Sequence, residues 1–195
     1  MGRFFPRTRV DAVEIDRELT HLGRRWFDLR NPRMTVHHED ARPFLRRSDG
    51  GYDAIFIDVY RQPYIPFYLA TREFFELARD RLRSGGCVIV NVGHPVGQDE
   101  LEEVLTATVG AAFANVARDP IEDTNTLLIA SEAPIAKTAL RRATAHLPAG
   151  LRATARAETA RLEAPLDGGP VYTDDRAPVE WLIDRSILDY AAGGE

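Results

Sequence analysis

The composition of this chain excludes several classes of protein. Its 195 residues, 44% of them hydrophobic and 28% charged, are typical of one globular domain, which we place at residues 1–195. The net charge of −5 argues against nucleic acid as a partner. The single cysteine, Cys87, excludes an internal disulfide framework and favours a cytoplasmic location. No apolar run approaches the ~20 residues of a membrane span, so we expect no membrane partner.

Apolar runs of strand length alternate with helical patterns through the first part of the chain. This alternation favours an α/β fold with a mostly parallel sheet and helices on both faces. The predicted strands are residues 9–15, 34–39, 52–58 and 87–93. The predicted helices are residues 16–29, 41–47, 71–83 and 98–113. The sequence "RSGG" at the end of the third helix predicts a glycine cap there.

The remainder of the chain predicts a hairpin followed by helices. Two β-like runs, residues 115–119 and 124–132, are separated by "PIED", which favours a C-terminal antiparallel hairpin. A series of βα units that ends in such a hairpin is typical of the methyltransferase-type Rossmann fold. Residues 132–195 read as a helical C-terminal part, with helices at 135–147 and 151–164 and a final helix near the end.

Acidic residues follow three of the predicted strands. Glu14 and Asp16 close the first strand in "VEID", Asp40 follows the second in "HED", and Asp58 closes the third in "FID". Ligands of open α/β sheets bind beyond the carboxyl ends of the strands, so these side chains are candidates for a binding site. Acids after strands also cap the next helix, and we expect that role for Asp16.

In its ordered motifs the sequence resembles the spermidine synthases, or polyamine aminopropyltransferases. The motifs are "VDAVEIDRELTHLGRRWF", "NPRMTVHHEDARPFL", "YDAIFIDVYRQP" and "TREFFELARDRLRSGGCVIVNV", in the family's order and spacing. The resemblance covers roughly residues 9–130 and returns near 172–182, where "YTDDRAPVEWL" is similar to a C-terminal segment of the family.

The resemblance implies a function and a set of site residues. Glu14 would bind the ribose of decarboxylated S-adenosylmethionine, the co-substrate, and Asp40 with Ala41 would contact its adenine. Asp58 would hold the attacking amine and help to remove its proton. The reaction would transfer an aminopropyl group to that amine and release methylthioadenosine. Proximity and a base would supply the catalysis, since a protonated amine has no lone pair with which to attack.

The chain also departs from the family. Arg61 stands where the family has a second aspartate, and a guanidinium ~4 Å from a substrate ammonium would cost on the order of 4 kcal/mol. Arg61 could instead pair with Asp58 or with the acids of "YTDD", while Tyr60 and Tyr64 are candidates for lining an amine pocket or for packing. His94 follows a strand end, and we expect a solvated loop histidine there rather than a base. We expect no metal.

The first strand and glycine-rich turn of the family have no counterpart. Residues 1–8 align with the end of the first helix, so the fold would lack its usual first strand. We expect a truncated form of a longer protein, or open strand edges that close on each other or pair with a second chain in a homodimer. Three functions stay open: an aminopropyltransferase, an S-adenosylmethionine-dependent methyltransferase, and a silent nucleoside-binding or interaction domain.

Overall fold

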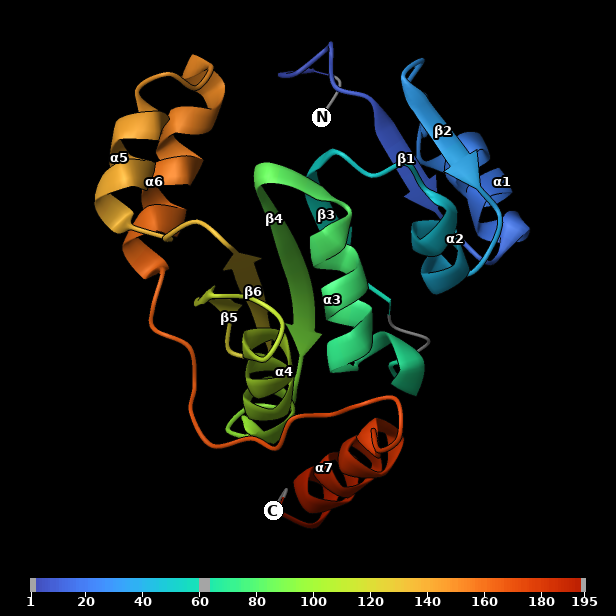
Figure 1. The fold of residues 1–195 in the computed structure, drawn as a ribbon, viewed down its shortest axis with the longest axis vertical. Coiled ribbons are helices and arrows are strands. Elements are labelled where there is room, and N and C mark those ends of the chain that lie inside the picture. The colour runs from blue at the N-terminus through green and yellow to red at the C-terminus, as the bar shows by residue number, and fades with distance from the viewer. Residues whose placement is uncertain (1–2, 60–63, 194–195) are drawn as a thin grey trace. The chain divides into compact units, whose positions relative to one another are not determined.

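The computed structural model describes residues 3–59 and 64–193, which belong to two compact units (Figure 1). The units are Met1–Asp49 and Gly50–Glu195. Helices alternate with strands in both, and each unit contains a parallel pair of consecutive strands. The predicted α/β class with a methyltransferase-type order of elements is confirmed. Within the described ranges, none of the helices has the length and apolar character needed to cross a bilayer.

The first unit is a parallel strand pair with two helices. Its elements are β1 (Val10–Val13), α1 (Arg17–Trp26), β2 (Met34–His37) and α2 (Ala41–Arg47). Val10 lies opposite Met34 in the register of β1 and β2. Leu45 is the one apolar residue that is buried among those described in this unit, whereas Trp26 and Phe27 are 67% and 81% exposed.

The second unit is built on a four-stranded sheet in the order β3-β4-β6-β5. Its strands are β3 (Tyr52–Ile57), β4 (Leu82–Gly93), β5 (Asn115–Glu122) and β6 (Asn125–Ser131). Its helices are η1 (Phe67–Leu69), α3 (Arg72–Asp80), α4 (Glu100–Gly110), α5 (Lys137–Thr144), η2 (Ala149–Leu151), α6 (Arg152–Arg161) and α7 (Val179–Gly193). The strand β3 is parallel to β4, and β6 is antiparallel to both β4 and β5.

The core of the second unit lies between this sheet and the helices α3 and α4, which cover one of its faces (Figure 1). Side chains of β4 alternate between the two faces, so Val88, Val90 and Val92 are buried in the core. On α3, Phe74 and Phe75 are 1% and 0% exposed and fill the same layer. This packing holds the sheet in place, and with it the end of β3, which Asp58 follows.

The boundary between α3 and β4 differs from the prediction. The helix ends at Asp80 rather than at residue 83, and β4 begins at Leu82 rather than at residue 87. The predicted glycine cap is therefore wrong, because both glycines lie inside the strand. Gly85 has a φ of +77°, next to a shift in the β3-β4 register, and a Cβ on Gly86 would lie 2.9 Å from the Tyr52 carbonyl oxygen. The glycines permit a bulged, close strand pairing.

The hairpin and the C-terminal helices are present as predicted, with shorter helices. The strand β5 extends to Glu122, so two residues connect it to β6. Pro120 is accommodated because β5 is the edge strand of its sheet. At the other side of the sheet, β3 pairs only with β4 among the described strands. In the first unit, β1 likewise has β2 as its described partner.

Residues 162–178 form a strap that runs from α6 past α4 to α7 (Figure 1). Glu163 forms an antiparallel bridge with Arg118 of β5, and the Tyr172 N–H donates to the Thr108 hydroxyl of α4 at 3.0 Å. Between these anchors, Gly169 lies against the backbone of Glu103 and Val104, where any side chain would overlap α4. The strap is thus held on both sides of its closest approach to that helix.

Candidate functional site

Glu14 lies at the carboxyl end of β1, as predicted. Its backbone N–H donates to the His37 carbonyl oxygen at 3.0 Å and continues the pairing with β2. The half-buried side chain accepts a 2.8 Å hydrogen bond at Oε1 from the Asp16 N–H. Among the described residues Oε2 has no partner. The carboxylate is therefore oriented through one oxygen and can accept hydrogen bonds at the other.

Two further acids of the first unit cap helices. Asp16 accepts the Glu18 N–H at 2.8 Å and is the N-cap of α1, as expected. Asp40 accepts the Arg42 N–H at 2.9 Å and is the N-cap of α2, whose first residue is Ala41. Because β1 and β2 are parallel, Glu14 and Asp40 lie at the same end of the pair. Capping fixes the Asp40 carboxylate at this end.

Asp58 lies at the corresponding strand end in the second unit. It follows β3, is exposed, and accepts a 3.1 Å hydrogen bond at Oδ1 from the Asn91 amide of β4. Sequence reasoning missed Asn91. The alternation of β4 could have identified it, because Asn91 lies between the buried Val90 and Val92 and thus on the opposite face. The amide orients the Asp58 carboxylate without neutralising it.

Tyr64 is the described member of the predicted substrate pocket. Its hydroxyl donates a 2.7 Å hydrogen bond to Asp184 Oδ1 of α7. This hydrogen bond, together with the negative charge of Asp184, raises the pKa of Tyr64 above its ordinary value of 10.0. The phenol therefore stays protonated at neutral pH. Tyr60 and Arg61 lie outside the described residues.

His94 belongs to a buried charge cluster rather than to a solvated loop, so that expectation was wrong. Its side chain is 6% exposed, and Nε2 lies 3.8 Å from Glu102 Oε2. Arg118 holds the fully buried Glu102, with Nε 2.6 Å from Oε1 and Nη2 donating to Oε2 at 3.1 Å. His94, Asp99 and Glu102 each offer one atom of a type that binds metal ions, and these three atoms lie within 4.8 Å of one another. However, Glu102 already forms an ion pair with Arg118, which also donates a hydrogen bond to Oε2.

Asp174 of "YTDD" ties the strap to the start of α3. Asp174 accepts from the Thr71 hydroxyl at 2.7 Å, and its backbone N–H donates to Glu73 Oε2 at 2.9 Å. Partial burial acts to raise the pKa of Glu73, but hydrogen bonds from its own backbone, the Asp174 N–H and Arg72 lower that pKa below its ordinary value. This segment therefore has a structural role at the start of α3.

A family comparison adds to this geometry. The family model of the spermine/spermidine synthase domain matches residues 3–121, more than half of the chain. The chain belongs to the spermine/spermidine synthase family. The predicted resemblance to spermidine synthases is confirmed, and the matched residues include every strand-end acid described above. A probable polyamine aminopropyl transferase of Bifidobacterium longum is 29% identical over 215 residues, covering 98% of this chain.

Solved structures agree with this assignment. A probable spermidine synthase of Corynebacterium glutamicum matches with a TM-score of 0.57 at 26% identity, over 85% of this chain and 66% of that one. Human methyltransferase-like protein 13, solved in complex with SAH, matches with a TM-score of 0.64 at 23% identity, over 89% and 79% of the two chains, and shows the shared fold. This member of the spermine/spermidine synthase family spans 48% of the length of the Bifidobacterium relative.

Proposed function

We propose that this chain takes part in aminopropyl transfer from decarboxylated S-adenosylmethionine to an amine. The observation that carries the proposal is the position of Glu14 and Asp40 at the carboxyl end of a parallel strand pair, in a chain of the spermine/spermidine synthase family. That end is where ligands bind in open α/β sheets. Methylthioadenosine is the expected product.

Glu14, Asp40 and Ala41 supply the nucleoside contacts in this proposal. Glu14 Oε2 accepts the ribose hydroxyls, while the bond from the Asp16 N–H keeps the carboxylate in place. Asp40 accepts a hydrogen bond from the adenine amino group, and Ala41 lies against the base at the start of α2. Charged acceptors make such hydrogen bonds stronger than neutral ones do.

Asp58 and Tyr64 supply the amine contacts in this proposal. Asp58 attracts the ammonium and accepts its proton, after which the amine lone pair attacks the propyl carbon beside the sulfonium. The new C–N bond forms as the C–S bond breaks, and the electron pair passes to sulfur in methylthioadenosine. The Tyr64 hydroxyl donates a hydrogen bond to Asp184, so its oxygen lone pairs are available to accept one from a substrate N–H. Tyr60 and Arg61, which the sequence suggested for the same pocket, lie outside the described residues.

Thermal unfolding with and without nucleosides tests the proposal. At about 100 times its dissociation constant, a ligand adds about 2.7 kcal/mol to the free energy of unfolding. For a chain of this size that is a shift of about 5 to 10 °C in Tm. Methylthioadenosine should stabilise the chain more than S-adenosylhomocysteine does.

Other outcomes would contradict the proposal in different ways. A preference for S-adenosylhomocysteine would favour a methyltransferase, whose fold the chain shares. If neither nucleoside shifts Tm, the nucleoside site is absent from this chain. Incubation with decarboxylated S-adenosylmethionine and a diamine, with methylthioadenosine release as the readout, then tests the transfer itself.

A further inference from the structure

The helices α5 and α6 concentrate positive charge in an acidic chain. Between residues 137 and 161 there are six cationic side chains and one acid, Glu158, a net charge of +5 in a chain whose total is −5. The six are Lys137, Arg141, Arg142, Arg152, Arg156 and Arg161. None of them is needed for the strand-end chemistry proposed above. A local excess of this size attracts anions.

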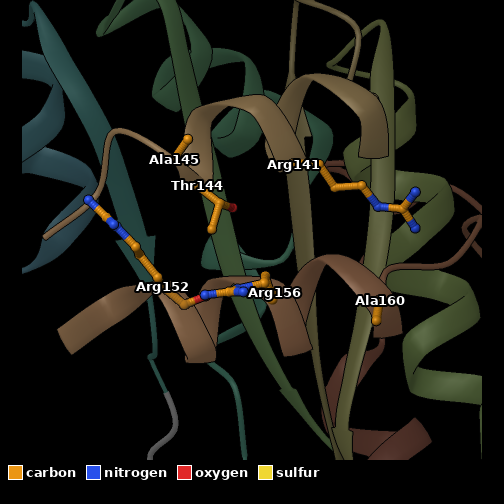
Figure 2. A pocket seen from close by; sticks show the side chains of 6 residues that line it. All are labelled: Arg141, Thr144, Ala145, Arg152, Arg156 and Ala160. Atoms are coloured by element: carbon orange, nitrogen blue, oxygen red, sulfur yellow. The ribbon is translucent and has the colours of Figure 1, made fainter. Parts of the chain in front are cut away.

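These two helices flank an open cavity of about 470 Å³, in which Thr144 is buried and the other lining residues are exposed. Its lining consists of Arg141, Thr144 and Ala145 from the α5 side and Arg152, Arg156 and Ala160 from α6 (Figure 2). Pockets of about 300 to 1,000 Å³ accommodate small-molecule ligands. In Figure 2 the three arginine side chains are spread along the space between the helices rather than converging on one point. Such a spread suits an elongated ligand with several negative groups.

Among the described residues, the arginines of this cavity lack the carboxylate partners that several other arginines of the second unit have. Arg152 and Arg156 donate through Nε to the backbone carbonyls of Leu147 and Arg152, at 2.9 and 3.1 Å. Within the described part of the chain, neither these two nor Arg141 has a carboxylate partner. By contrast, the nearby Arg161 forms two hydrogen bonds with Asp119. The cavity arginines therefore keep their terminal N–H groups for an external acceptor.

The cavity lies at the opposite end of the sheet from Asp58. The strand β6 leads into α5, and its last residue, Ser131, pairs with Cys87 near the start of the buried part of β4. Asp58 is bonded to Asn91, toward the carboxyl end of the same strand. A ligand between α5 and α6 would therefore leave the Asp58 edge open.

We propose that the cavity between α5 and α6 binds a small oligophosphate, a molecule with two or more linked phosphate groups. Guanidinium groups bind phosphate oxygens through paired, charge-assisted hydrogen bonds, and their planar geometry matches that acceptor. Three separated guanidiniums engage successive phosphates along the cavity. A single orthophosphate reaches only part of this set, so it binds more weakly. This anionic ligand is distinct from the cationic substrates of the proposed transfer reaction.

Calorimetric titration of the full chain with tripolyphosphate tests this site. Saturable binding at one site is expected, tighter than with orthophosphate. The variant Arg152→Gln/Arg156→Gln should bind at least about tenfold more weakly, because it loses two charge-assisted contacts. The matched control is Arg24→Gln/Arg33→Gln, which removes the same charge from two exposed arginines of the first unit and should bind as the wild type does.

A second pair of variants keeps every arginine. Ala160→Glu places a carboxylate in the cavity and should abolish binding. Its control is Ala157→Glu, at an exposed position of α6 outside the lining. Ala157→Glu should change the affinity less than about threefold, the level expected of a screened surface charge. Circular dichroism confirms that all variants stay folded. Equal weakening by both arginine pairs would mean nonspecific attraction to charge and would overturn the proposal. So would an absence of tripolyphosphate binding, or retained binding in Ala160→Glu.

Discussion

The substitution Arg118→Met tests the buried charge cluster around α4. Glu102 is completely buried, and the Arg118 guanidinium, itself 16% exposed, is its close cationic partner at 2.6 Å. Removing one member of a buried ion pair leaves an uncompensated charge and costs about 3–5 kcal/mol. For a chain of this size that loss lowers Tm by roughly 6 to 20 °C. Methionine keeps most of the packing volume of the arginine stem, so the loss reports the charge.

Urea unfolding of three variants separates the possible causes. Arg118→Met should show the full loss, whereas Glu102→Leu/Arg118→Met, which removes both charges, should be much closer to the wild type. Glu163→Gln serves as the control, because this second partner of Arg118 is 54% exposed and should contribute under about 1 kcal/mol. A loss below about 1 kcal/mol in Arg118→Met would refute the reasoning. A double variant as unstable as the single one would show that packing, not charge, is responsible.

Three further predictions concern the proposed active site. Glu14→Gln keeps an acceptor for the Asp16 N–H but loses the charge, so isothermal titration should show methylthioadenosine binding about tenfold to a hundredfold more weakly. Asn91→Ala should lower kcat of aminopropyl transfer about tenfold while leaving KM for the nucleoside substrate unchanged, because it releases Asp58; a changed KM with unchanged kcat would contradict this. The raised pKa of Tyr64 means that its bond to Asp184 stabilises the fold below pH 10 and is lost as pH rises through that pKa. In urea unfolding at several pH values, the difference between wild type and Tyr64→Phe should therefore shrink in strong alkali.

Local patterns predicted the order of the elements because each pattern reflects short-range physics. Apolar alternation located β3 and the later part of β4, and the hairpin of β5 and β6 followed from two β-like runs around "PIED". The end of α3 could not be predicted in this way. Gly85 and Gly86 are typical of a helix cap, but here they serve the bulged pairing of β4 with β3, which depends on a strand distant in sequence.

For the candidate site, too, the sequence predicted the features that depend on local pattern and not those that depend on distant segments. The rule that ligands bind at strand ends selected Glu14 and Asp58 without any structure. Their partners were of two kinds, since the Asp16 N–H is two residues from Glu14 but Asn91 is 33 residues from Asp58. The burial of His94 also depends on long-range packing. Such contacts between distant segments leave no trace in a local sequence pattern.

Because Gly169 lies so close to the backbone of α4, substitutions at this position should be tolerated less well than changes elsewhere in the strap. A side chain at this position must displace the strap outward, yet Glu163 and Tyr172 hold it on either side. The anchors prevent the strap from shifting along α4 to make room for a side chain, so even alanine should be selected against at position 169. Extra residues between the two anchors would instead provide slack. Among homologues, the segment between Glu163 and Tyr172 should therefore vary in length more readily than Gly169 is replaced by another residue.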